Sequence, residues 1–343
     1  MIAISAADAV SPAIQRTRDF LFRPFNWGTY LKLGLVAIIT EGTGSNFHSH
    51  TSSQGGHAPG HGPSGTPLFH LTPEMVAVIV AAVLAAIVLS FVICYLVTRL
   101  RFAFFHCLVN NSTEIRPGWR LYGAQAARFF WLNVVVGFCF LLLVVLVALP
   151  FVAGFWRLIH EIPPGGQPDP WLLLSLVLPL IPVILLLVLA GILVDIILRD
   201  WMLPHYALDD ATAGEAWAEV WDCIRAEKRQ FFVYALLRVV LPTIATIGLI
   251  VVLLIPGLIV AGSFGVFEYG IHSAFAGATG ASAVVGIIIQ VFFGLIAFFL
   301  MLLASICLGG PVSTGIREYA LIFYGGRYQA LGEMLYPPPT TAA

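Results

Sequence analysis

Long apolar runs dominate the chain, and short polar segments separate them. A helix needs about 20 mostly apolar residues to span about 30 Å of hydrocarbon, and five runs reach that length. A sixth run is shorter and contains Lys32, and we interpret it as a short crossing through a locally thinned bilayer. The pattern predicts an all-α integral membrane protein with six transmembrane helices: Trp27–Thr40, Met75–Val97, Trp131–Trp156, Trp171–Leu198, Phe231–Ala261 and Val284–Leu308.

The composition supports a membrane environment for one polytopic domain over residues 1–343. Hydrophobic residues make up 59% of the chain and charged residues only 10%, whereas a soluble domain usually has about 25% charged residues. Too few polar side chains are therefore available to cover a water-exposed surface. Residues 41–72, rich in Gly, Ser and His, are predicted to form a flexible outer loop, and residues 337–343 a disordered tail.

Basic residues mark one side of the predicted spans. The segments on the other side, 41–72, 157–170 and 262–283, contain a single lysine or arginine, Arg157. Because positive residues near span ends stay in the cytoplasm, this asymmetry predicts a cell (inner or plasma) membrane protein with both termini cytoplasmic. The residues on the predicted cytoplasmic side are Arg16, Arg18, Arg23, Arg99, Arg101, Arg116, Arg120, Arg128, Arg199, Arg225, Lys228, Arg229, Arg317 and Arg327.

An amphipathic helix is predicted between the fourth and fifth spans. Thr212 followed by Glu215 is a capping box, which is typical of a helix start. Apolar residues then recur with helical spacing on an otherwise charged segment, which favours an interfacial helix on the cytoplasmic side. The predicted apolar stripe consists of Trp217, Val220, Trp221 and Ile224.

Similar segments suggest an internal repeat. Arg101 precedes Trp119, and Arg199 precedes Trp217, by the same interval after a spanning run. Residues 5–22 form a third candidate copy of the amphipathic segment. We therefore predict a unit of one amphipathic helix and two spans, used three times.

The segment "RDWMLPHYALDDATAGEAWAEVWDCIRAEKRQFFVYALL" resembles a recurrent segment of uncharacterised multi-span bacterial and archaeal membrane proteins. That group includes the membrane domain fused to some glycerophosphodiester phosphodiesterases. The resemblance covers about residues 75–238 and implies architecture only, since no segment outside the membrane is long enough for the catalytic barrel. The matching positions are Asp200, Pro204, Ala216, Trp217, Phe231, Phe232 and Tyr234.

Polar residues inside the predicted spans form a candidate intramembrane site: Asp195, Arg199, Arg238 and Gln290. Such residues are costly in lipid and usually face the interior of a bundle. One interpretation is a polar cavity or ion path. The favoured interpretation is structural, with Asp195 paired to Arg199 or Arg238 near the headgroups, because both ions lie at a shallow depth.

Histidines provide weaker candidates for chemistry. His48, His50, His57 and His61 have spacings that suit metal binding, but their glycine-rich surroundings favour a solvated loop. His205 with Asp209 and Asp210 suggests a metal or acid–base cluster, although aspartates are also favoured before a helix N-terminus. We expect no metal site and no cofactor.

These features favour a non-enzymatic membrane scaffold or accessory protein that engages lipids or unidentified protein partners at the inner surface. The alternative is a transporter or channel for a small solute or lipid. An enzyme acting on lipid headgroups is the least favoured class, because the chain has no phosphate loop, HExxH or GxSxG motif. Nucleic-acid binding is not expected, because the few basic residues follow the membrane edge.

Overall fold

The computed structural model describes residues 4–45, 73–161, 170–275 and 281–336. Every element within these ranges is helical, so the prediction of an all-α protein is confirmed. Five helices are long and apolar enough to cross a membrane, as in a multi-pass membrane protein: Glu74–Val109, Gly123–Leu158, Leu173–Leu208, Lys228–Ile255 and Val284–Gly325. Most of the predicted outer loop with its five histidines, and the predicted tail, lie outside the described residues.

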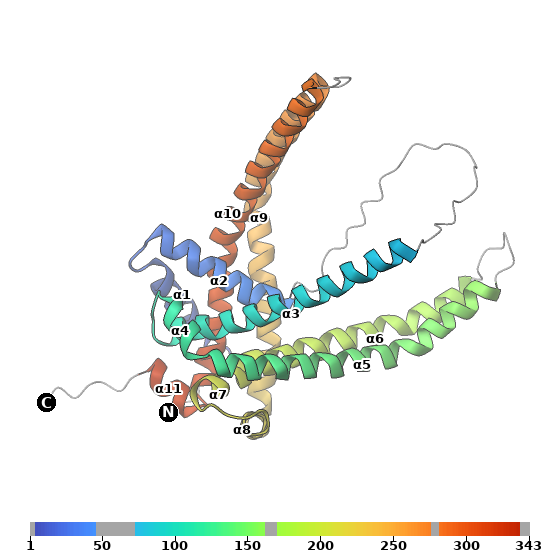
Figure 1. Ribbon diagram of the computed structural model, residues 1–343. Coiled ribbons are helices and arrows are strands. Elements are labelled where there is room, and N and C mark those ends of the chain that lie inside the picture. Colours follow the sequence, from blue (N-terminus) through green and yellow to red (C-terminus); the bar gives the residue numbers. More distant parts are fainter. Residues whose placement is uncertain (1–3, 46–72, 162–169, 276–280, 337–343) are drawn as a thin grey trace.

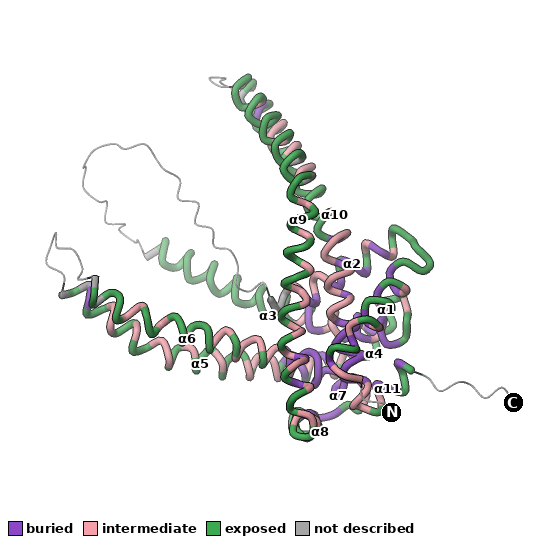
Figure 2. The backbone as a smooth tube through the Cα atoms, turned by 180° about the vertical axis from the view of Figure 1, so that it is seen from behind, coloured by how far each residue is buried: buried purple, intermediate pink, exposed green. Residues whose placement is uncertain are grey.

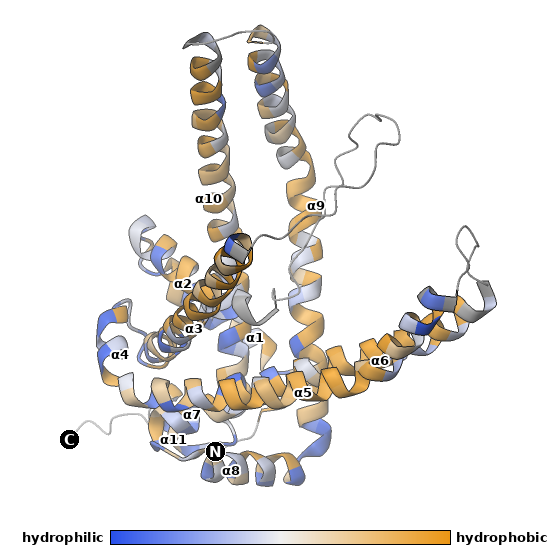
Figure 3. Cartoon of the chain, turned by 45° about the vertical axis from the view of Figure 1, so that its right-hand side comes forward, coloured by the Kyte–Doolittle hydropathy of each residue, from blue (hydrophilic) through white to orange (hydrophobic). Residues whose placement is uncertain are grey.

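The long helices extend from a common centre as three arms (Figure 1). One arm is α3 (Pro73–Val109) alone. The second pairs α5 (Gly123–Glu161) with α6 (Pro170–Ile196), and the third pairs α9 (Lys228–Ala274) with α10 (Ala281–Gly325). The arms are largely exposed and strongly hydrophobic (Figures 2 and 3). Each of the five longer predicted spans lies within one of these helices, apart from the last residues of Trp171–Leu198, which continue beyond α6.

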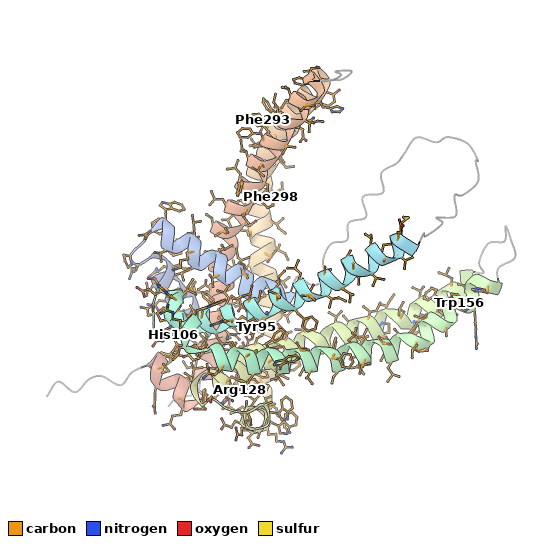
Figure 4. All side chains as sticks on the ribbon, viewed as in Figure 1. Tyr95, His106, Arg128, Trp156, Phe293 and Phe298 are labelled. Atoms are coloured by element: carbon orange, nitrogen blue, oxygen red, sulfur yellow. The ribbon has the colours of Figure 1, made fainter. Side chains whose placement is uncertain are left out.

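We call the buried centre where the arms meet the hub. Aromatic side chains fill much of it, including Phe102, Phe129, Tyr234 and Phe323, whose relative exposure is 0%. Figure 4 shows His106 and Arg128 at this end of the arms, and Trp156 and Phe293 far from it. Shorter helices complete the hub: α1 (Val10–Phe22), α2 (Trp27–Ser45), α4 (Ile115–Leu121), the π-helix η1 (Ile197–Met202), α7 (Leu203–Leu208), α8 (Ala213–Ala226) and α11 (Gln329–Leu335).

The two ends of the described chain meet at the hub. Arg327 donates from Nη1 to the carbonyl of Ile4 at 3.1 Å, and the hydroxyl of Tyr319 donates to the carbonyl of Ala6 at 3.1 Å. Arg16 of α1 also pairs with the fully buried Glu318 of α10 at 3.0 Å. The N-terminal helix is therefore fixed to the same end of the molecule as the C-terminal segment.

The position of α2 differs from the predicted crossing over Trp27–Thr40. The helix passes very close to α10, because a Cβ atom added to Gly310 would lie 2.7 Å from the Cα of Gly34. Its far end returns to the hub, where the carbonyl of Thr40 accepts hydrogen bonds from Arg101 and Arg199. The same prediction placed Thr40 outside and both arginines inside. In addition, α2 is not among the five helices apolar enough to span. The sixth crossing is therefore not supported.

Candidate functional site

Charged side chains in the hub interior form the strongest candidate site. Glu41 of α2 forms ion pairs with Arg199 of η1 and Arg238 of α9. Its Oε2 lies 3.0 Å from the Nη2 atom of each arginine. The side chains of Glu41 and Arg199 are only 7% and 4% exposed. Burial alone would raise the pKa of Glu41, but Arg199 and Arg238 outweigh this effect and lower the pKa to about 2. Glu41 is therefore ionised at neutral pH.

Asp200 of η1 is the second buried carboxylate and is 1% exposed. Its Oδ2 accepts hydrogen bonds from Arg238 Nε and from the hydroxyl of Tyr234, both at 2.8 Å. Its Oδ1 accepts from Arg317 Nη1 at 3.1 Å. Arg238 therefore bridges Asp200 and Glu41, and links α9 to both α2 and η1.

Three arginines lie where α3, the α6–η1 segment and α10 enter the hub. Arg101 Nε and Arg199 Nη2 donate to the carbonyl of Thr40 at 3.1 and 2.8 Å. Arg317 Nη1 donates to the carbonyl of Arg199 at 2.8 Å. One helix from each of the three arms is thus joined to its neighbours by a guanidinium group, which can donate in several directions at once.

Consecutive side chains reach the hub interior along the π-helical turn η1 and along α7, which follows it. Leu198, Arg199, Asp200, Trp201 and Met202 are all buried. A standard helix at the edge of a core buries mainly one stripe of its surface. Within η1, the charges of Arg199 and Asp200 and the ring of Trp201 contact different neighbours. Short π segments of this kind are frequent at functional sites.

We call this set the ion network: Glu41, Asp195, Arg199, Asp200, Arg238 and Arg317, with Arg101 at its edge. Glu41 and Asp200 are each held by two arginines, so neither is a free base. Removing one partner of a buried ion pair costs about 3–5 kcal/mol, because the other charge is left uncompensated. The arrangement therefore fixes the relative positions of the helices.

The predicted intramembrane site is formed in part. Asp195 pairs with Arg199 at 3.0 Å, as one of the predicted alternatives required. Arg238 joins the same network, but through Glu41 and Asp200 rather than Asp195. Gln290 is not part of it: it lies between α9 and α10 in the third arm, beside Glu268 and Phe293.

The amphipathic helix is present as α8, and its capping box is confirmed by both reciprocal hydrogen bonds between Thr212 and Glu215. The four residues of the predicted apolar stripe divide into two inward and two outward positions. Val220 is fully buried and Ile224 packs against the core, whereas Trp217 and Trp221 are exposed and stacked with ring centroids 5.8 Å apart. Ala216 takes the inward position, because its small side chain allows α8 to approach the hub.

Most residues of the family pattern also lie in the hub. Tyr234 is fully buried, with its ring 4.3 Å from that of Phe323, and Phe231 packs 4.8 Å from Trp201. Pro204 and Ala216 are buried as well. In contrast, Trp217 is 45% and Phe232 71% exposed, so these two positions face outward.

The histidine cluster differs by one member from the predicted one. His205 is buried and lies near Asp209, but Asp210 turns away to pair with Arg128. Glu219 of α8 takes the place of Asp210, with 2.9 Å between its Oε2 and His205 Nδ1. Sequence spacing alone could not find Glu219, because the loop between α7 and α8 brings it back toward His205.

Three residues of the ion network were missed by the sequence analysis as site residues: Glu41, Asp200 in its ionic role, and Arg317. A usable signal was present. Arg199-Asp200-Trp201 and Arg317-Glu318-Tyr319 both consist of an arginine, an acid and an aromatic residue at the end of an apolar run. Glu41 has no such signal, because its partners come from distant segments.

These features define a class, an all-helical multi-pass membrane protein with a charged and aromatic hub. The chain belongs to a family of unknown function, DUF7544, whose family model matches residues 4–334. No curated protein and no solved structure matches the chain. This match agrees with the expectation of an uncharacterised family and extends over nearly the whole chain. The resemblance to the membrane domain of glycerophosphodiester phosphodiesterases finds no support.

Proposed function

We propose that the protein is a non-enzymatic membrane scaffold or accessory protein that engages partner proteins or lipids. The observation that carries this proposal is the contrast between the hub and the arms. The hub charges are paired with one another, whereas the arms diverge with apolar surface on all sides. Residues 74–94 of α3, for example, are exposed throughout. Apolar surface on this scale needs lipid or partner helices to cover it.

The proposed orientation places the hub in or just beneath the cytoplasmic leaflet of a cell membrane, with both termini cytoplasmic. It is supported by the positive residues that gather near the hub and by the contacts that hold both chain ends there. On this orientation α8 is an interfacial helix, with the stacked Trp217 and Trp221 toward the headgroups. Arg225, whose guanidinium lies 5.2 Å from the Trp221 ring centroid, would face lipid phosphates.

A threefold repeat fits the same proposal. The three units would be α1–α3, α4–η1 and α8–α10, each ending in a helix that brings an arginine into the hub. Arg101, Arg199 and Arg317 are those arginines, and the first two share the Thr40 carbonyl. The first unit departs from the pattern, because α2 returns to the hub.

Photocrosslinking in cells tests the scaffold function. A photoreactive phenylalanine analogue would replace Trp217 on α8 or Leu185 on α6, two exposed positions, in separate variants. We expect adducts with a defined protein or with lipid from these positions. The matched control is Phe102, which is buried in the hub and should give only intramolecular products. Equal, unspecific products from the exposed and buried positions would overturn the proposal.

The transporter alternative has less support. A path would have to connect the buried charges to the far side of the membrane, yet Gln290, the remaining residue of the candidate intramembrane site, lies apart from them in the third arm. Flux assays in reconstituted vesicles separate the two functions. The scaffold proposal predicts no solute flux above that of empty vesicles. A flux that Arg238→Ala abolishes would establish transport instead.

A further inference from the structure

His205, Asp209 and Glu219 bring one nitrogen and two oxygen donors together where α7 meets α8. His205 Nδ1 lies 2.9 Å from Glu219 Oε2 and 3.7 Å from Asp209 Oδ2, and the three atoms all lie within 4.8 Å of one another. His205 is only 2% exposed, whereas the carboxylates of Asp209 and Glu219 are 44% and 56% exposed. The group therefore has a buried base and a solvent-accessible rim.

The imidazole of His205 is held by its other nitrogen. Nε2 lies 2.6 Å from the hydroxyl of Tyr324, a fully buried residue of α10. Nδ1 is buried and makes no hydrogen bond of acceptable geometry, although the carboxylate oxygens of Glu219 and Asp209 lie 2.9 and 3.7 Å from it. If the Nε2 proton is donated to Tyr324, the lone pair of Nδ1 is directed toward Asp209 and Glu219. A buried nitrogen with an unused lone pair is costly unless a ligand satisfies it.

We propose that His205, Asp209 and Glu219 form a binding site for a divalent first-row transition metal, with Zn²⁺ as its best probe. Zn²⁺ binds imidazole nitrogen and carboxylate oxygen at about 2.0–2.2 Å, so two ligands of a tetrahedral ion lie about 3.3 Å apart. The two distances from His205 Nδ1, 2.9 and 3.7 Å, fall on either side of this value. Water would complete the coordination from the exposed side.

Two tyrosines support the ligands from outside. The hydroxyl of Tyr328 donates to Asp209 Oδ2, and its ring packs against His205 with centroids 4.1 Å apart. Tyr324 fixes the orientation of the imidazole through Nε2. Metal-bound histidines and carboxylates typically have such hydrogen-bond partners, which set the tautomer and the direction of the lone pair.

The site would connect α8 to α7, two helices that otherwise make few contacts with each other. Much of α8 is exposed, and Ala216 and Val220 are its only fully buried residues among those that the structure describes. A metal ion bound to Glu219 of α8, to His205 of α7 and to Asp209 at the end of α7 would fix α8 to the hub. Metal availability would then control the order of this helix. The site does not depend on the scaffold function.

The test uses full-length, tag-free protein in detergent, stripped of metal by a chelator. The loop histidines are replaced by serine in this background, because they could bind metal unspecifically: His48, His50, His57, His61 and His70. Titration calorimetry with Zn²⁺ should then give one ion per chain. Co²⁺ should give the absorption bands of a low-symmetry site with nitrogen and oxygen ligands.

Exposed ligands provide variants that should leave the fold intact. Glu219→Gln and Asp209→Asn should each lower the affinity more than about 100-fold, since removal of an outer-shell partner alone costs about 10–100-fold. Asp222→Asn, an exposed carboxylate on the same helix, should leave binding unchanged. Tyr324→Phe should weaken binding about tenfold without changing the stoichiometry, because the hydroxyl only positions His205.

Hydrogen exchange gives a second readout. Zn²⁺ should slow exchange over residues 213–226, and Glu219→Gln should abolish this protection. The proposal is overturned if the loop-substituted protein binds no Zn²⁺, or if Glu219→Gln and Asp222→Asn bind it equally. The three residues would then be an ion pair around a protonated His205.

Discussion

Asp200→Asn is the substitution that tests most directly how much the ion network stabilises the hub. Asp200 accepts hydrogen bonds from Arg238, Arg317 and Tyr234, and it is 1% exposed. Asparagine has almost the same volume, but it removes the negative charge and directs an NH₂ group toward an arginine donor. The expected cost is about 3–5 kcal/mol, the usual cost of leaving a buried charge without its partner.

Asp195→Asn is the matched control, because the same chemical change is made on the same segment. The Asp195 side chain is 40% exposed, and its partner Arg199 keeps Glu41 and the Thr40 carbonyl. The expected cost is only about 0.2–1 kcal/mol, as for pairs that the protein does not bury. The two variants therefore separate a buried network from an ordinary helix-surface pair.

Thermal unfolding in detergent, followed with a thiol-reactive fluorophore, measures the difference. Cys107 is fully buried in the hub and becomes reactive only when the hub opens. The other cysteines are replaced so that the signal reports the hub alone. Asp200→Asn should lower the midpoint far more than Asp195→Asn. Equal midpoints for the two variants would refute the inference that these charges hold the helices together.

The remaining predictions concern helix contact, acidity and capping. Gly310→Ala should destabilise the hub by about 1–3 kcal/mol, because the new methyl group would lie 2.7 Å from the backbone of Gly34. Gly294→Ala is the control and should not destabilise it, because a Cβ atom there has no atom within 4 Å. Equal unfolding midpoints for the two variants in the thiol assay would contradict this contact. The contribution of the Glu41 ion pairs to the free energy of unfolding should be complete above the ordinary pKa of 4.5 and lost as pH falls through about 2. Glu41→Gln should remove this loss of stability from acid unfolding curves. A curve that Glu41→Gln leaves unchanged would argue against the pairing. Thr212→Ala should cost α8 about 1 kcal/mol, seen as faster hydrogen exchange over residues 213–226, and unchanged exchange would contradict the capping role.

Much of the fold could be predicted from the sequence because spanning a bilayer needs long apolar helices. The five longer runs were located correctly for this reason. The capping box at Thr212 and Glu215 was also found, since its signal is local. The sixth run is not confirmed as a span. Trp27–Thr40 is too short and too polar to be diagnostic, and its position depends on tertiary contacts of Gly34 and Thr40.

The candidate site was predictable only where its partners are close in sequence. Asp195 and Arg199 are one helical turn apart, so their pair could be found by spacing. Glu41 meets Arg199 and Arg238 across more than 150 intervening residues, and no periodicity carries that information. The sequence also left open which apolar residues of α8 face the hub, because a helix with both small and large apolar residues can bury either set, and the hub accepts Ala216.

The orientation of the hub is the claim on which the scaffold proposal rests, and labelling of single cysteines tests it most directly. In a cysteine-free background, Asp222→Cys lies on α8 and Tyr269→Cys near the far end of α9, both at exposed positions. The proposal predicts that an impermeant thiol reagent labels position 269 in intact cells and position 222 only after permeabilisation. Labelling of position 222 from the medium while position 269 stays protected would contradict it.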